Sequence, residues 1–332
     1  MPGVASETVP QGPHVAVRVP AKVNLFLSVR GIRDDGYHEL TTVLQTVGVF
    51  DELRASLAGP PGRGQHPASR RHMRLELAHD DIAGLPDRSD NLAMRAALAL
   101  AHDAGVIDGA LSVREDGPRT LLELDKAIPV AGGMAGGSAD AAAALVALNE
   151  LWGCALPRER LKELGAELGS DVPFCVVGGT ALATGRGTSL ARVLCRGEFT
   201  WLALLDDDPL STAEVYREWD ARCAPSEVEP DAVLQALRAC DPEALGAALH
   251  NDLEPAAFAL RPDLATRKQH LLEAGVFGAV LSGSGPTMLG LAASPAHARE
   301  IAGRLPVGVG RTVVVTSPAG GPELRRNAAA EQ

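Results

Sequence analysis

The sequence is poor in aromatic residues and cysteines. Aromatic residues make up 3% of the 332 residues, so the core must be built from Ala, Val and Leu. The five cysteines are scattered and form no C-x-x-C pair, which argues against a disulfide framework or a zinc site and favours the reducing cytoplasm. A signal peptide and a membrane span are not expected, because no cationic start precedes an apolar run and no apolar stretch reaches about 18 residues without a break.

Basic residues are also in deficit. The chain has 42 acidic and 31 basic residues, for a net charge of −11. This balance argues against nonspecific binding to nucleic acid or to an anionic membrane, so we expect a small-molecule partner and neither of those two. Lysine is scarce among the basic residues and occurs only at Lys22, Lys126, Lys162 and Lys268.

The pattern of apolar residues predicts an α+β fold. Alternating and β-branched segments predict strands at 15–19, 23–29, 41–49, 72–77, 110–114, 120–124, 199–205, 279–281, 287–291 and 311–316. Ala- and Leu-rich segments predict helices at 91–104, 138–152, 161–168, 212–219, 231–239, 242–248, 262–274 and 296–304, the first capped by Asp90. Residues 174–183 are interpreted as a strand with a Gly-Gly break. Short strands in irregular alternation with helices favour α+β over a doubly wound parallel sheet.

The length predicts about two domains. We place the first at residues 14–190 and the second at 191–318. The flanking segments 1–13 and 319–332 are rich in Pro, Gly, Ala or polar residues and are expected to be frayed or disordered tails. A Gly- and Pro-containing stretch at 59–72 is expected to be a loop.

The most informative motif is a glycine-rich segment before the long helix at 138–152. It reads PVAGGMAGGSADAAAAL, with glycines that let a ligand approach the backbone closely. The free N–H groups and the positive dipole end of the helix point back at this segment, which is typical of a phosphate site. Ser138 adds a hydroxyl at its mouth for a phosphate or a metal. Tight packing of strand against helix is the alternative explanation for the glycines.

Two well-known phosphate loops do not match this segment. A P-loop needs a lysine after its last glycine, and Ser138 follows Gly137 here. The dinucleotide fingerprint has a different glycine spacing and belongs to the first βα unit, whereas this segment begins at Pro129. A nicotinamide-dependent oxidoreductase is therefore not supported.

Two motifs near the N-terminus carry further candidate residues. In PAKVNLFL, Lys22 and Asn24 are two residues apart, so both point to one face of a strand. In DGYHEL, the Asp35-Gly36 pair predicts a turn that presents Tyr37 and His38. Taken singly, these residues would be explained as a surface lysine and a packing pair.

Two later motifs are also ordinary when taken alone. In GSDVPF, Asp171 follows a Gly-Ser turn and precedes a proline that we expect to start a strand. In LSGSGPT, residues 282–287 form a second Gly/Ser loop between two predicted strands. This loop is either a plain turn or a second backbone cradle lying against a bound phosphate.

In this order, the motifs resemble the GHMP family of small-molecule kinases over residues 15–316. The glycine-rich segment and SGSGPT mark the family, and the Lys-Val-Asn and Asp-Gly-Tyr-His segments are similar to members acting on a cytidine-diphosphate-linked methylerythritol. The resemblance implies two α+β domains with the active site in the cleft between them. It also implies ATP-dependent phosphorylation of that substrate's C2 hydroxyl, with Mg²⁺, in the bacterial non-mevalonate route to isoprenoid precursors. We expect a cytoplasmic monomer or weak homodimer.

The resemblance also implies residue roles. Lys22 and Asp171 correspond to the catalytic pair, and Asn24 to a residue lining the substrate. Tyr37 and Tyr216 match aromatic residues that stack on cytosine, and His38 matches the residue that hydrogen-bonds it. The segment that wraps the ATP phosphates corresponds to Pro129, Val130, Ala131, Gly132, Gly133, Met134, Ala135, Gly136, Gly137, Ser138 and Ala139, with Ser138 also the candidate metal ligand.

This sequence departs from the family pattern at the end of that segment. Many members carry two serines where this chain has Ser138-Ala139, and two family glycines are Ala131 and Ala135. Two alternatives remain open. One is another GHMP kinase for a sugar, homoserine or mevalonate, which would not need Tyr37 and His38. The other is a non-catalytic nucleotide-binding protein, which would not need Lys22 with Asp171.

Overall fold

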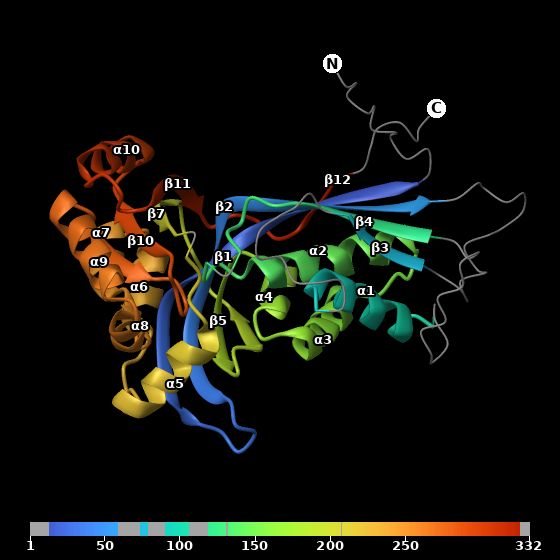
Figure 1. The fold of residues 1–332 in the computed structure, drawn as a ribbon, viewed down its shortest axis with the longest axis horizontal. Helices are drawn as coiled ribbons and strands as arrows, with labels where there is room; N and C mark the ends of the chain where they lie inside the picture. The colour runs from blue at the N-terminus through green and yellow to red at the C-terminus, as the bar shows by residue number, and fades with distance from the viewer. Residues whose placement is uncertain are drawn as a thin grey trace, which may run out of the picture.

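The computed structural model describes residues 13–58, 74–78, 90–105, 119–130, 132–206 and 208–325 (Figure 1). The strand expected at 110–114, the loop at 59–72, Ala131 and the outer parts of both tails lie outside the described residues. Within the described ranges, no helix is both long and apolar enough to cross a membrane.

The first half of the chain forms a sheet built on one long hairpin. Strand β1 (His14–Ile32) joins the two strands predicted at 15–19 and 23–29. Strand β2 (His38–Ala58) extends the strand predicted at 41–49 at both ends. The sheet runs in the order β12-β1-β2-β4-β3, and β5, β6 and β8 lie off this path. The added strands are β3 (Arg74–Ala78), β4 (Arg119–Asp125), β5 (Thr180–Gly185), β6 (Ser189–Arg192), β8 (His250–Asn251) and β12 (Glu323–Arg325).

The register of β1 against β2 shifts between Pro20 and Ala21 and again between Asn24 and Phe26. Such irregularities bend a strand and redirect its side chains. Pro20 contributes because proline has no N–H to donate to the ladder. Lys22 and Asn24 therefore lie on a short segment of β1 with a register shift at each end.

Four helices lie on one side of this sheet (Figure 1); α1, α2 and α4 contact its strands, and α3 packs on the other three helices. They are α1 (Leu92–Asp103), α2 (Gly136–Leu151), α3 (Arg158–Leu168) and α4 (Val172–Val177). Helix α2 is buried along most of its length, and its alanines let α1 and β1 approach closely.

Two local expectations were wrong here. Asn91, not Asp90, caps α1, because its side chain accepts a hydrogen bond from the Ala93 N–H at 2.9 Å. Residues 172–177 form a helix instead of the expected strand, since Pro173 lies in the first helical turn, where its fixed φ is already suitable. Gly178 and Gly179 then adopt positive φ, the chain leaves the helix, and β5 follows.

The second half of the chain forms an antiparallel sheet in the order β11-β7-β10-β9. Its strands are β7 (Phe199–Leu205), β9 (Gly278–Leu281), β10 (Met288–Ala292) and β11 (Arg311–Ser317). Its helices are α5 (Thr212–Arg222), α6 (Asp231–Ala239), α7 (Pro242–Ala248), α8 (Glu254–Leu260), α9 (Pro262–Ala274) and α10 (Pro295–Arg304). Helix α8 was not expected from the sequence. Two mixed sheet-and-helix halves confirm the α+β class.

The chain returns to the first sheet after β11, which corrects the expectation of a frayed tail from residue 319. The Ala319 N–H donates to the Thr46 carbonyl at 3.0 Å, and β12 pairs antiparallel with β1. The return requires close backbone contact, because a Cβ on Gly178 would lie 2.3 Å from the Gly321 Cα. The domain division near residue 190 remains our proposal.

Strand β8 connects the two halves. It pairs in parallel with β1, and the Asn251 side chain donates to the carbonyls of Leu281 and Gly283 at 2.8 and 2.7 Å. The next residue, Asp252, accepts from the Val29 N–H at 2.8 Å and lies 2.7 Å from the His250 ring. This segment therefore holds the SGSGPT loop against β1.

We expect Asp252→Asn to lower the free energy of unfolding at pH 7 by about 1.5–3 kcal/mol, the usual contribution of hydrogen bonds to a charged group. Burial raises the pKa of Asp252, but hydrogen bonds from His250 and the Val29 N–H outweigh it and lower the pKa below its ordinary value. The stabilisation is therefore present above the ordinary carboxyl pKa and is lost as the pH falls through the lowered one.

Urea unfolding at pH 7 and pH 3 measures this effect, and the difference between the parent and Asp252→Asn should shrink at pH 3. Asp231→Asn, at the exposed start of α6, is the matched control and should change stability by less than about 0.5 kcal/mol. Equal stability of the parent and Asp252→Asn at pH 7 would show that this carboxylate does not hold the two halves together.

Candidate active site

Lys22 is a buried lysine with two oxygen partners. Its Nζ lies 3.0 Å from Asp171 Oδ2 and donates to Asn24 Oδ1, also at 3.0 Å. The Lys22 side chain is 6% exposed, whereas that of Asp171 is 33% exposed. The spacing of Lys22 and Asn24 predicted a shared face, and their hydrogen bond confirms it. The ion pair thus presents its carboxylate to solvent and keeps its ammonium inside.

The Asn24 amide is held in one orientation. Its Nδ2 donates to Thr42 Oγ1 at 2.8 Å, and that hydroxyl donates in turn to the Phe26 carbonyl at 2.6 Å. Asn24 Oδ1 is thereby left to face Lys22. Asp171 is positioned by α4, where it occupies the residue before the first helical one.

The two glycine-rich loops pack directly on each other. Ser282 Oγ donates to the Gly133 carbonyl at 2.9 Å, and the Thr287 N–H donates to the Gly132 carbonyl at 3.4 Å. No side chain fits between them, because a Cβ on Gly133 would lie 2.3 Å from the Ser282 carbonyl oxygen. The Lys22 N–H donates to the Met134 carbonyl at 3.1 Å, so the first loop is also tied to β1.

Helix α2 begins without a side-chain cap. Ala135 occupies the capping position in the left-handed region, with φ 56° and ψ 37°, and none of its side-chain atoms can accept a hydrogen bond. Gly137 is exposed and Ser138 half-buried at this end, so its N–H groups and one hydroxyl are available to an anion. Ala139 is fully buried in the core, so a second hydroxyl at that position would not face a ligand.

A buried cluster of charges that the motif analysis missed lies beneath this end of α2. Lys126 Nζ is 2.5 Å from Asp51 Oδ2 and 2.6 Å from Asp140 Oδ2. Asp51 also accepts two backbone hydrogen bonds, from Ala127 at 2.7 Å and Ile128 at 2.8 Å, whereas Asp140 Oδ1 has no hydrogen-bond partner among the described residues. The scarcity of lysine could have pointed to Lys126 as it did to Lys22, but nothing local links Lys126 to Asp51.

Burial raises the pKa of Asp140 to about 7, against the opposing charge of Lys126. One ammonium serves two buried carboxylates, and Asp51 has the better set of donors. Asp140 is therefore the carboxyl of this pair that retains its proton more readily.

The expected base-binding residues lie at the start of β2 and on α5. The His38 ring stacks on Tyr216 with centroids 4.5 Å apart, and Trp219 lies edge-on to His38 at 5.6 Å. His38 Nε2 is 2.7 Å from Asp220 Oδ1. Trp219 and Asp220 were not among the residues singled out from the sequence, although Asp220 is four residues after Tyr216 and so on the same side of the helix.

The aromatic group adjoins the ion pair. Burial and the negative charge of Asp171 raise the pKa of Tyr216, so the phenol lies within electrostatic range of that carboxylate. Tyr37 follows the expected turn, in which its N–H donates to Asp35 Oδ1 at 3.2 Å, and its side chain is exposed. The structure therefore gathers Lys22, Asp171, His38 and Tyr216 into one region, with Tyr37 beside it.

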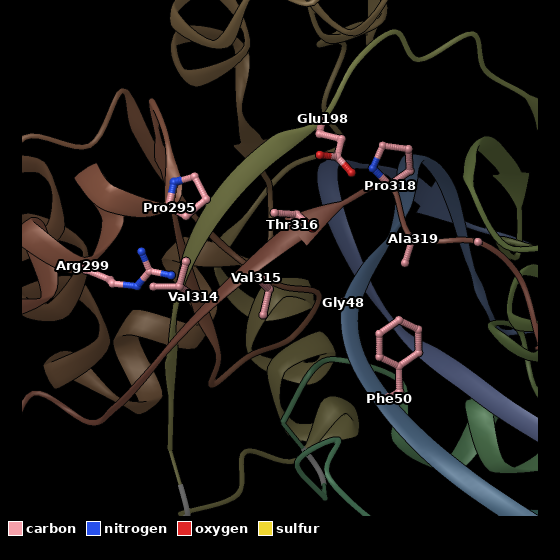
Figure 2. Close-up of a pocket in the computed structure, with 11 residues that line it drawn as sticks. Gly48, Phe50, Glu198, Pro295, Arg299, Val314, Val315, Thr316, Pro318 and Ala319 are labelled. Carbon is pink, nitrogen blue, oxygen red and sulfur yellow. The ribbon is translucent and has the colours of Figure 1, made fainter.

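Two open grooves of about 450 and 440 Å³ lie on either side of Phe50, near the junction of the two sheets. Figure 2 shows the first, with Phe50 and Thr316 facing it. Neither groove is lined by Lys22 or Asp171, so we assign the site from its side-chain chemistry. The described ranges contain no group of three or more His, Cys, Asp or Glu side chains suited to a metal ion.

The geometry at Gly136 predicts a defect of folding. A Cβ there would lie 3.2 Å from Ile128 Cγ2 and 3.3 Å from Lys126 Nζ, so it would press on the buried charge cluster. We expect Gly136→Ala to lower the free energy of unfolding by about 1–3 kcal/mol, as overpacking does.

Gly137→Ala is the matched control, because its Cβ would make an ordinary contact of 3.4 Å with Leu92 Cδ1. Within a helix this change should be neutral or stabilising by up to about 1 kcal/mol. Urea unfolding of both variants makes the comparison. If Gly136→Ala matches the parent in stability, the charge cluster can move to accept a side chain.

Comparison with known proteins agrees with this geometry. The model of the GHMP kinases N terminal domain matches residues 91–179, and that of the GHMP kinases C terminal domain matches residues 233–307. A crystal structure of a 4-(cytidine 5'-diphospho)-2C-methyl-D-erythritol kinase superposes with a TM-score of 0.71 at 31% identity, covering 92% of this chain and 100% of that one. A homoserine kinase from Cytophaga hutchinsonii superposes at 0.70 with 18% identity, a likeness of fold alone.

Sequence relatives extend over nearly the whole chain. The 4-diphosphocytidyl-2-C-methyl-D-erythritol kinase of Thermobifida fusca is 48% identical over 294 residues, which cover 88% of this chain and 91% of that protein. The kinase of the same name from Mycolicibacterium smegmatis is 44% identical over 320 residues, which cover 94% and 92%. The chain therefore belongs to the GHMP kinase family, beside its 4-diphosphocytidyl-2-C-methyl-D-erythritol kinases.

Proposed function

We propose that this chain is an ATP-dependent kinase that phosphorylates the C2 hydroxyl of 4-diphosphocytidyl-2-C-methyl-D-erythritol, a step of the non-mevalonate route to isoprenoid precursors. The observation that carries the proposal is the 3.0 Å ion pair between Lys22 and Asp171, placed beside the aromatic group of His38 and Tyr216. Relatives of 44–48% identity that bear this kinase name support the choice of substrate.

The uncapped start of α2 fits the phosphates of ATP. Its free N–H groups and dipole favour an anion there, and the packed glycines of the two loops fix the backbone in advance. Mg²⁺ needs few protein ligands when phosphates supply the rest. Ser138 would hold the ion through its hydroxyl, and the ion would neutralise part of the charge of the phosphates.

The Lys22–Asp171 pair provides the chemistry at the acceptor. Asp171, the exposed member, orients the substrate hydroxyl and accepts its proton as the oxygen forms a bond to the γ-phosphorus. The bond between that phosphorus and the oxygen bridging to the β-phosphate breaks, and ADP leaves. The Lys22 ammonium stabilises the charge that develops, and Asn24 keeps it in place. Transfer of this kind depends mainly on positioning and charge.

The base pocket gives the substrate preference. Tyr37 is 54% exposed, so its ring can stack on cytosine. His38 follows it in the chain and stacks on Tyr216, and the contact between His38 and Asp220 sets the position of the imidazole that would hydrogen-bond the base. A kinase for mevalonate, homoserine or a sugar has no use for this arrangement.

The direct test is ATP turnover with the cytidine substrate compared with mevalonate, homoserine and galactose. We expect phosphorylation of the cytidine substrate alone.

Asp171→Asn should abolish turnover and leave binding of ATP and substrate largely intact. Single-turnover activity within about tenfold of the parent, roughly 1.4 kcal/mol in barrier, would remove Asp171 from its place at the hydroxyl.

The base pocket predicts a separate effect on specificity. Stacking of a base on an aromatic ring contributes about 1–3 kcal/mol, so Tyr37→Ala should raise the KM for the cytidine substrate by roughly ten- to a hundredfold. His38→Ala should also relax discrimination against the uridine analogue, whose donor and acceptor are exchanged. ATP affinity is the internal control and should stay constant. Loss of ATP binding with unchanged cytidine preference would show that these residues do not hold the base.

A further inference from the structure

Arg186 occupies the tip of the turn between β5 and β6, a place the motif analysis did not single out. Gly185 and Gly187 on either side of it have φ of 70° and 87°, a region that favours glycine. Gly185 pairs with Leu40 of β2. The turn therefore presents Arg186 beside the start of β2. His38 is the first residue of that strand, and Tyr37 immediately precedes it.

The guanidinium of Arg186 stacks on Tyr37. Its Cζ lies 3.7 Å from the centre of the Tyr37 ring, a cation–π contact. The contact covers one face of the ring, and the exposure of Tyr37 leaves the other face for a base. A platform of this kind is stiffer than a free tyrosine, because the planar guanidinium limits rotation of the ring.

Arg186 has unused donors. Its Nε is buried and has no hydrogen-bond partner, and no ion pair to Arg186 occurs among the described residues. Asp35 is close enough to respond to its charge, but that carboxylate is bonded to Arg33 and to the Tyr37 N–H. Since a buried donor without a partner costs free energy, an acceptor that comes from outside the chain would complete this site.

The position of the turn indicates which acceptor. A Cβ on Gly187 would lie 4.0 Å from the Cβ of Ser170, the residue before Asp171. Arg186 thus has the base-binding residues on one side and, on the other, Asp171, the carboxylate that would accept the proton of the substrate hydroxyl. A substrate with a base at one end and its reacting hydroxyl at the other must pass this point with the group that joins them.

We propose that Arg186 is a substrate-binding residue that donates to the diphosphate of a nucleotide-linked alcohol while its guanidinium stacks on Tyr37. This inference rests on the proposed function, because the span from Tyr37 to Asp171 matters only if one substrate fills it. The guanidinium suits the task, since its planar fork can donate twice to phosphate oxygens and still present a face to an aromatic ring.

The test measures binding of three probes to the full chain by titration calorimetry: CDP, cytidine and ADP. We expect Arg186→Gln to weaken CDP binding by ten- to a hundredfold and cytidine binding by less than threefold, with ADP unchanged. Arg186→Lys keeps the charge without the fork and should fall between the parent and Arg186→Gln. With the complete substrate, KM should rise and kcat should stay within threefold.

Arg192→Gln is the matched control, because Arg192 is an exposed arginine of the same hairpin and should leave all three affinities unchanged. Equal loss of CDP and cytidine binding in Arg186→Gln would reduce Arg186 to a support for Tyr37 and overturn the proposal. So would a CDP affinity equal to that of the parent. If the parent itself binds no CDP and does not phosphorylate the cytidine substrate, the proposed function fails together with this inference.

Discussion

The site depends on one buried ammonium. Lys22 is joined through its backbone N–H to the first glycine-rich loop, and through its side chain to Asn24 and Asp171. A charge removed from water is tolerated only when it is well paired, so these three contacts must form together. A register shift on either side bends this part of β1, while Lys22 and Asn24 stay paired with Thr46 and Leu44 of β2. Strand, loop and helix α4 are thereby fixed relative to one another around a single residue.

The second constraint is the absence of side chains where the two loops meet. Gly133 and Ser282 approach so closely that no Cβ fits between them, and Asn251 of β8 holds the second loop by two hydrogen bonds. The glycine-rich segment before α2 is therefore supported by the SGSGPT loop and by Asn251, which both belong to the second half of the chain. A cradle for a strongly charged ligand needs this rigidity, because donors that are already in position need no reorganisation when the ligand binds.

Lysine and aromatic side chains are scarce in this chain, yet both kinds lie at the candidate site. The chain carries a net charge of −11, yet Lys22 and Arg186 place cations beside the acceptor carboxylate and the base-binding residues. The chain's two tyrosines, Tyr37 and Tyr216, both lie in this region. Such local placement allows an acidic protein to bind an anionic nucleotide without attracting polyanions in general.

By itself, the sequence determined the local structure and the chemistry of the motifs. Ala- and Leu-rich segments located helices α6, α7 and α9, and the glycine-rich motifs marked both loops, because these signals depend on neighbouring residues. Only the tertiary structure decided the return of β12 to β1 and the partners of Lys126 and Arg186. These features depend on contacts between residues far apart in the chain. The free energy of such contacts comes from distant segments, so the residues next to each feature in the sequence do not predict it.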